Sequence, residues 1–247
     1  MRKIITIVAL LAATSLQAEP IELKGGDGFK LGADYYAADK PRAAVLMLHQ
    51  CNADRSMYDA LGKQLAKRGI SALSLDFRLY GDSTKGAINI KTIRASEPDR
   101  AKRRQLMAPH RQQWPADVLV AEQYLRQKVG SEVKLGVVGA SCGGTQALAL
   151  AADTQVDALM FFSSGMNDKN QDNYRKLSTI PTFIIAAEED TYTYNSAQNL
   201  FKLASHGQSR LVNYKGRGHG HPLFDVDLNL KDNMVSWFSR QLITSGK

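Results

Sequence analysis

Hydrophobic and polar positions follow two patterns that alternate along this chain. Nearly unbroken apolar runs such as 43–49 and 70–75 are typical of strands buried on both faces of a sheet. Elsewhere apolar residues recur every three or four positions, as Met57, Leu61 and Leu65 do, which indicates amphipathic helices. The pattern predicts strands at 21–23, 29–36, 43–49, 70–75, 133–138, 156–162, 182–187 and 210–214. It predicts helices at 55–68, at 114–128, directly after residue 141, at 194–205 and at 224–242.

The order of these elements predicts an α/β fold. Strands that alternate with helices form a mostly parallel sheet, here of about eight strands, with helices on both faces. Only Gly25-Gly26-Asp27-Gly28 separates the first two strands, which predicts an N-terminal antiparallel hairpin at the edge of the sheet. No repeat or low-complexity tract divides the chain, so we expect a single domain over 19–247. In such sheets the ligand site lies beyond the carboxyl ends of the strands.

The beginning of the chain differs in character from the rest. Met1-Arg2-Lys3 precedes a mostly apolar run at 4–13, and small residues follow up to Ala18. This order is typical of a secretory signal peptide, and the apolar run is too short to span a bilayer. We therefore predict that 1–18 is removed and that the mature protein is periplasmic or secreted, without a stable membrane span. An uncleaved amphipathic anchor is the alternative.

Positive charge is concentrated in one segment of the mature chain. Residues 83–114 contain eight basic and two acidic residues, whereas the net charge of the rest of the mature chain is zero. The simpler interpretation is a solvated helical surface. Because the segment follows the strand ending near Asp76, it also leaves the sheet at the edge where the ligand site is expected.

A functional interpretation makes 83–114 a basic insertion or small cap over the site. Such a cap would concentrate anionic substrates, with Arg103 and Arg104 as contacts, or hold the protein against acidic surface polymers. Aromatic residues are not interleaved with these charges in the way that stacking on bases requires. Together with export, this argues against a nucleic-acid partner.

The strongest chemical signal is a serine in a glycine-rich turn. Gly139-Ala140-Ser141-Cys142-Gly143-Gly144 comes directly after a predicted strand and leads into an alanine- and leucine-rich helix. A G-x-S-x-G turn holds its serine in a strained conformation that exposes the hydroxyl, and glycines avoid collisions with neighbouring elements.

A serine nucleophile needs a base and a group that orients the base. Asp190 and His219 both follow strands and come after Ser141 in the order acid, then histidine. Glu188 and Glu189 are alternatives to Asp190 as the acid.

A second histidine lies close to His219. His221 precedes Pro222 at the approach to the last helix, so a structural contact is the expected role of His221. With Asp225 and Asp227, the two histidines also offer metal ligands, but no further cluster at ligand spacing supports a metal site.

These residues resemble those of an α/β-hydrolase, nearest to the dienelactone hydrolase-like and small carboxylesterase branch. The matching stretches are Leu46 to Gln50, Leu75 to Ser83, the serine turn, Pro181 to Asp190, and Gly218 to Gly220. They cover nearly all of the mature chain. Two features depart from the branch: His49-Gln50 stands where His-Gly is usual, and Ser141 stands where dienelactone hydrolases carry a cysteine. The second departure leaves a lactone substrate in doubt.

The resemblance also implies an oxyanion hole. Its donors would be the backbone amide of Cys142 and that of either Gln50 or Cys51. Because such amides converge on one oxygen, we hypothesise a Cys51–Cys142 disulfide that fixes the hole; two unbonded buried thiols are the alternative.

The sequence as a whole predicts an exported serine hydrolase. Ser141, His219 and Asp190 would cleave a small-molecule carboxylic ester through an acyl-enzyme, without a cofactor. The same residues could serve a peptidase, an amidase or a thioesterase. An alternative of another class is a non-catalytic protein on a hydrolase scaffold that binds polyanions or the cell surface.

Overall fold

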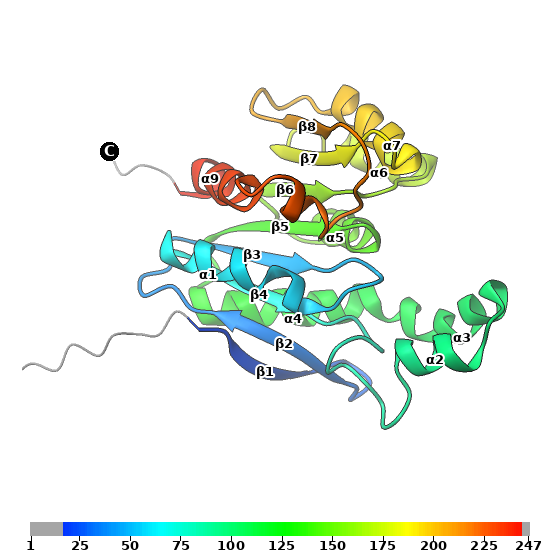
Figure 1. Ribbon diagram of the computed structural model, residues 1–247. Coiled ribbons are helices and arrows are strands. Elements are labelled where there is room, and N and C mark those ends of the chain that lie inside the picture. The colour runs from blue at the N-terminus through cyan, green and yellow to red at the C-terminus, as the bar shows by residue number, and fades with distance from the viewer. Residues whose placement is uncertain (1–16, 244–247) are drawn as a thin grey trace, which may run out of the picture.

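The computed structural model of the protein describes residues 17–243, so most of the predicted signal peptide lies outside the described residues. Within this range one sheet has the strand order β1-β2-β4-β3-β5-β6-β7-β8 (Figure 1). The strands are β1 (Glu19–Lys24), β2 (Lys30–Tyr36), β3 (Ala43–Leu48), β4 (Ile70–Leu75), β5 (Lys134–Ala140), β6 (Ala158–Phe162), β7 (Thr182–Ala187) and β8 (Arg210–Tyr214). The helices are the 3-10 helix η1 (Arg55–Tyr58), α1 (Asp59–Lys67), α2 (Ile90–Ser96), α3 (Arg100–Gln112), α4 (Trp114–Val129), α5 (Cys142–Asp153), α6 (Asp168–Lys176), α7 (Thr191–Leu203), α8 (Leu223–Val226) and α9 (Leu230–Leu242).

The sheet confirms the predicted fold class. β1 and β2 form an antiparallel pair, β2 pairs antiparallel with β4, and the strands from β4 to β8 are parallel to their neighbours. Gly139 of β5 is in register with Leu48 of β3 and with Phe161 of β6, while Ala187 of β7 is in register with Tyr214 of β8. The carboxyl ends of these strands are therefore level, and the loops that follow them share one edge.

Helices cover both faces of the sheet and explain the unbroken apolar runs. α1 and α9 lie on one face, and α4, α5, α6 and α7 lie on the other (Figure 1). Consecutive side chains of a strand enter opposite layers, so that Leu46 and Val137 join one apolar cluster while Met47 and Val138 join the other. No helix within residues 17–243 has the length and apolar content needed to cross a bilayer.

The structure corrects the prediction of a single final helix over 224–242. Asp227 is extended between α8 and α9, and its carboxylate accepts hydrogen bonds from the Tyr214 hydroxyl (2.6 Å) and the Asn229 amide (2.9 Å). These contacts stabilise a break that the apolar periodicity does not reveal. The pattern also missed α6, a mostly polar helix in which Tyr174 is the buried residue.

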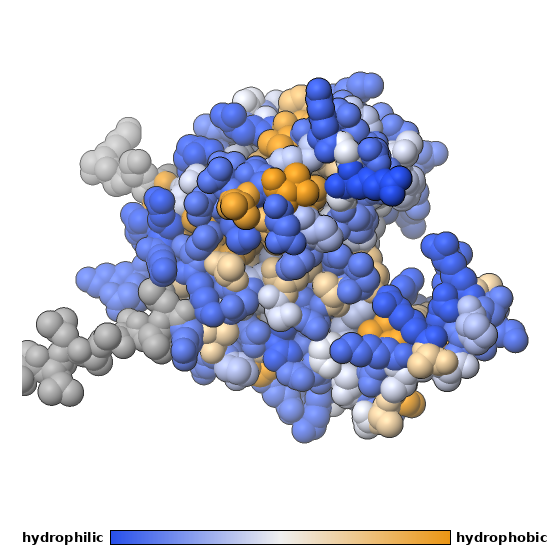
Figure 2. All heavy atoms as spheres, in the orientation of Figure 1, coloured by the Kyte–Doolittle hydropathy of each residue, from blue (hydrophilic) through white to orange (hydrophobic). Residues whose placement is uncertain are grey.

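Residues 83–114 contain the short helices α2 and α3, which project from the sheet (Figure 1). Asn89 caps α2 with a reciprocal capping box, and the Asp99 carboxylate accepts from the Lys102 amide (2.7 Å) at the start of α3. Ile93 and Met107 are the buried residues of these two helices. Figure 2 shows the pair as a largely hydrophilic projection, separated by a notch from the body of the molecule.

Candidate active site

Ser141 occupies the sharp turn between β5 and α5. Its backbone has φ 51° and ψ −115°, a conformation that a residue with a side chain rarely adopts. The glycines around it are required by space: a Cβ on Gly139 would lie 2.3 Å from the Gly143 carbonyl oxygen, and one on Gly143 would lie 2.3 Å from that of Leu48. The turn thus holds a partly exposed serine at the carboxyl edge of the sheet.

The structure brings Asp190 and His219 together. Asp190 follows β7, His219 follows β8, and Nδ1 of the imidazole lies 2.6 Å from Oδ2 of the carboxylate. The Thr193 hydroxyl donates to the same carboxylate oxygen. With Nδ1 protonated toward Asp190, Nε2 of His219 remains free to accept a proton. Glu189 instead pairs with Arg217 at the surface (2.8 Å).

Two hydrogen bonds tie the serine turn to the histidine loop. The Ser141 amide donates to the Phe162 carbonyl (2.9 Å), and the next residue, Ser163, accepts the Gly220 amide on its hydroxyl (2.9 Å). Within residues 17–243, neither Oγ of Ser141 nor Nε2 of His219 makes a hydrogen bond to another residue. Contacts of this kind commonly tighten only when substrate is bound.

The Gln50 side chain holds the histidine loop from the other side. Its Oε1 accepts the His221 amide (2.8 Å), and its Nε2 donates to the Asn52 side chain. Gly220 has φ 65°, and a Cβ there would lie 1.8 Å from Gln50 Oε1. Gln50 stands where the resembling family usually has a glycine, and its side chain adds a contact to the loop that carries His219. This contact leaves room only for a glycine at position 220.

The two cysteines form a disulfide. Their sulfur atoms are 2.19 Å apart and their α-carbons 5.8 Å apart, which lies within the usual range for such bonds. Cys51 belongs to the loop after β3, and Cys142 is the first residue of α5. As the first amide of a helix, the Cys142 N–H has no acceptor within the helix. The bond thus joins the two segments that carry the predicted oxyanion donors.

His49 is buried next to this loop and has a structural environment. Its Nε2 accepts the Phe77 amide (3.0 Å), and Nδ1 lies 2.8 Å from the Gln50 carbonyl oxygen. Burial lowers the pKa of His49 to about 4. The ring is therefore neutral near pH 7 and orients the backbone of Gln50.

The remaining candidate residues lie on α3 and in the loop after β8. Arg103 donates to the carbonyl oxygens of Glu97 (2.9 Å) and Pro98 (2.6 Å), while Arg104 is exposed on α3. His221 packs its ring edge against Phe224. Within the described part of the chain, no group of three or more His, Cys, Asp or Glu residues is arranged to hold a metal ion.

Three contacts of this site were not predicted from the sequence. They are the Thr193 hydroxyl on Asp190, the Ser163 hydroxyl on the Gly220 amide, and the Gln50 side chain on the histidine loop. The glycines beside His219 indicate that another group approaches this loop closely, but the order of residues along the chain does not identify that group.

Comparison with known proteins identifies the family and supports the fold. Residues 33–225 match the model of the dienelactone hydrolase family. No curated protein sequence matches the chain significantly. The structure is similar to an esterase of Pyrococcus furiosus (TM-score 0.69, 15% identity, 92% of this chain and 94% of the other) and to a dienelactone hydrolase of Anabaena variabilis (0.67, 18%, 92% and 98%). A carboxyl esterase of Bacillus coagulans is also similar (0.69, 11%, 93% and 100%). At these identities, the structural likeness establishes the fold.

Proposed function

Because the chain belongs to the dienelactone hydrolase family of α/β-hydrolases, we propose that it is an exported serine hydrolase that cleaves carboxylic esters through Ser141, His219 and Asp190. The observation that carries the proposal is the 2.6 Å contact between His219 and Asp190, on the sheet edge where the strained Ser141 turn lies. The similar structures described as esterases support the ester as substrate.

The reaction follows from these positions. Oγ of Ser141 attacks the ester carbonyl carbon while Nε2 of His219 takes the hydroxyl proton, and Asp190 stabilises the imidazolium. The amides of Cys142 and of Gln50 or Cys51 donate to the oxyanion. Collapse expels the alcohol, which takes the proton from His219. Water then attacks the acyl group on Ser141 and releases the acid, with His219 again carrying the proton.

A matched pair of acidic residues tests the proposal. We expect Asp190→Asn to lower kcat by roughly 10⁴-fold, because the histidine loses the carboxylate that fixes its tautomer. Glu189→Gln removes an adjacent acid that pairs with surface Arg217, and should retain wild-type kcat. The assay is a panel of aryl esters that vary in acyl length and charge. Equal effects of the two substitutions would contradict the assignment, and no turnover by the wild type would favour a non-catalytic binding protein.

Export is a second part of the proposal. The Cys51–Cys142 disulfide supports an oxidising compartment, and the composition of 1–18 supports a cleaved signal peptide. Mass spectrometry of protein from the periplasm or medium should give a chain that begins at Glu19 and has no alkylatable thiol. An intact Met1 on cytoplasmic protein would contradict this.

A further inference from the structure

A pocket between α2 and α3 is lined mainly by arginine. Its cavity of about 300 Å³ is bounded by Ile90, Met107 and five arginines, which are Arg94, Arg100, Arg103, Arg104 and Arg111. None of these five makes an ion pair with another residue in the range 17–243. We call this site the arginine pocket.

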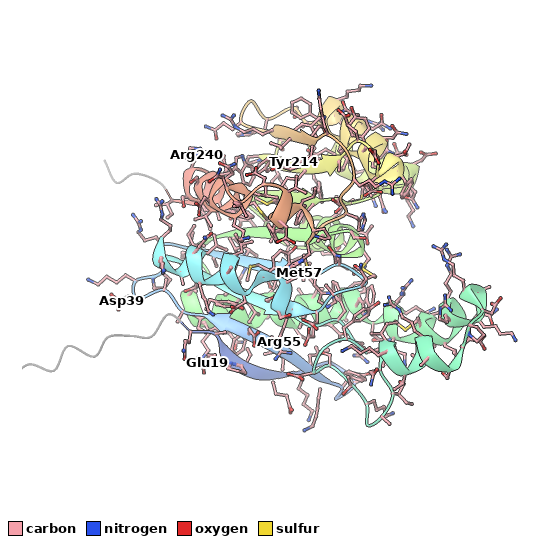
Figure 3. All side chains as sticks on the ribbon, in the orientation of Figure 1. Glu19, Asp39, Arg55, Met57, Tyr214 and Arg240 are labelled. Carbon is pink, nitrogen blue, oxygen red and sulfur yellow. A yellow bond between two sulfur atoms is a disulfide. The ribbon has the colours of Figure 1, made fainter. Side chains whose placement is uncertain are left out.

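Elsewhere the same chain supplies carboxylates to its partly buried arginines. Arg55, labelled in Figure 3, pairs with Asp34 (3.0 Å), Asp76 and Asp82 (2.6 Å). The other buried or partly buried arginines, Arg78 and Arg126, are also paired with carboxylates, whereas the arginine pocket gathers five arginines, four of them exposed, without an ion pair among the described residues. Like charges crowded in one place repel one another, and a bound anion relieves that repulsion.

The arginine pocket adjoins the candidate active site. Arg94 donates to the Cys51 carbonyl oxygen (2.9 Å), and Nη2 of Arg111 lies 4.0 Å from the Cys51 sulfur. Cys51 is bonded to Cys142, which directly follows Ser141. The edge of the arginine pocket is thus connected, through one disulfide bond, to the residue next to Ser141.

Two buried donors beside this boundary have no partner within the described residues. They are the Tyr80 hydroxyl and the Trp114 indole nitrogen, on side chains that are almost fully buried. Burial raises the pKa of Tyr80, whereas the positive charges of Arg111 and Arg94 and a contact from Arg111 to the hydroxyl oxygen oppose that rise; the hydroxyl proton itself has no acceptor among the described residues. Arg111 also lies over the Trp114 ring (5.4 Å). Neither side chain lines the arginine pocket, but an unpaired buried donor is costly, and a negative charge bound in the pocket would stabilise the donor dipoles beside it.

We propose that the arginine pocket binds an anionic group of the substrate, so that the preferred substrates are esters whose acyl part carries a negative charge. The inference rests on the proposed function and narrows its substrate class. The arginines supply the positive charge that attracts the anion and the N–H groups that bind it.

Matched esters test the preference. The charged substrates are the 4-nitrophenyl half-esters of succinate and suberate, and the neutral ones are 4-nitrophenyl butyrate and octanoate of the same chain lengths. In the variant Arg100→Glu/Arg104→Glu, we expect kcat/KM for at least one charged ester to fall by about 10- to 100-fold, as loss of charge-assisted contacts implies. The matched neutral ester should change less than about twofold, and 0.5 M NaCl should weaken the wild-type preference.

The control variant is Arg210→Glu/Arg240→Glu, which makes the same change in net charge at exposed positions outside the pocket (Arg240 is labelled in Figure 3). It should leave the ratio of charged to neutral turnover unchanged. Equal effects of both double variants, or equal effects on charged and neutral esters at both chain lengths, would overturn the inference in favour of a solvated helical surface.

A binding measurement separates this inference from the proposed function. Calorimetric titration of Ser141→Ala protein with succinate and suberate requires no catalysis. At least one should bind at least tenfold more tightly than the neutral amide of the same chain length, butyramide or octanamide, and the preference should disappear with Arg100→Glu/Arg104→Glu. If the diacid is preferred in this way while wild-type Ser141 proves unreactive toward esters, only the proposed function fails. If neither diacid is preferred while Ser141 is reactive, only the anion site fails.

Discussion

Cys51 and Cys142 act at the scale of single residues by fixing two backbone segments against each other. Each cysteine stands at a position whose amide is a candidate oxyanion donor, so the covalent bond limits how far those amides can separate. An oxyanion hole is effective because its donors are already in place when charge develops. We therefore predict that the disulfide affects the rate of hydrolysis as well as stability.

Replacing both cysteines by alanine tests this role. We expect kcat to fall by up to about 100-fold, since one oxyanion donor is worth roughly 3 kcal/mol. The free energy of unfolding should fall by roughly 2–5 kcal/mol, because the bond closes a long loop. Ester hydrolysis and urea unfolding measure the two effects. Reductant should reproduce the loss of kcat in the wild type and have no effect on the double variant, whereas an unchanged kcat in the double variant would contradict the role.

His49 gives a pH dependence of stability. Its pKa is about 4 in the folded protein and 6.5 without the burial that lowers it. Below pH 6.5 the unfolded chain therefore binds a proton that the folded protein excludes. The free energy of unfolding should fall as the pH decreases from 6.5 to 4, by at most about 3 kcal/mol from this residue, and should be independent of His49 above that window.

Urea unfolding at several pH values measures this slope. His49→Gln retains an oxygen that can accept the Phe77 amide but does not titrate, so the slope between pH 6.5 and 4 should flatten. His206→Gln changes a histidine in a loop at the surface and should keep the wild-type slope. A slope that His49→Gln leaves intact would show that other groups account for it.

At the scale of elements, the site is an assembly of loops that follow neighbouring parallel strands. The loop after β8 is held by Ser163 from the β6 end and by Gln50 from the β3 end, through the amides of the two residues that directly follow His219. The position of the imidazole therefore depends on segments distant in sequence. A disturbance of one loop contact should alter catalysis more than stability.

Gly220 and Gly216 provide a matched comparison of this dependence. Both have positive φ, but a Cβ on Gly220 meets the Gln50 side chain, whereas one on Gly216 meets nothing within 4 Å. Alanine at either position should cost about 1 kcal/mol of stability through backbone strain. Only Gly220→Ala should lower kcat/KM by about tenfold or more, which corresponds to about 1.4 kcal/mol. Added Gln50→Ala should recover part of the loss, and equal activities of the two glycine variants would contradict the account.

At the scale of the whole molecule, Arg78 joins three distant parts of the chain. It lies after β4 and pairs with Asp27 of the β1–β2 hairpin (2.7 Å) and with fully buried Asp117 of α4 (2.6 Å). These pairs hold the antiparallel edge and α4 to the parallel sheet. Asp117 depends on this arginine, because a buried carboxylate without a partner is strongly unfavourable.

Arg78→Met should therefore lower the free energy of unfolding by roughly 3–5 kcal/mol. The control is Arg175→Met, which removes an exposed pair with Asp172 and should cost less than about 1 kcal/mol. Adding Asp117→Leu to Arg78→Met should restore much of the stability, since it removes the uncompensated charge. Denaturant unfolding measures all three, and similar losses for Arg78→Met and Arg175→Met would contradict this role.

The parts of the fold that the sequence predicted are those with local signals. Buried strands have continuous apolar runs, and the Ser141 turn has glycines at fixed offsets. α6 was missed because it buries little apolar surface, and the break at Asp227 depends on a hydrogen bond from Tyr214. The roles of Gln50, Ser163 and Thr193 depend likewise on partners that only the folded chain brings near, so composition and spacing could not reveal them.

The central claim is that Ser141 is a nucleophile activated by the histidine loop, and covalent labelling tests it most directly. Purified mature protein is treated with a fluorophosphonate and digested, and the modified peptide is identified by mass spectrometry. The account predicts one adduct, on Ser141, formed rapidly in the wild type, slowly in His219→Ala and not at all in Ser141→Ala. An unmodified wild-type protein, or an adduct on another residue that persists in Ser141→Ala, would contradict it.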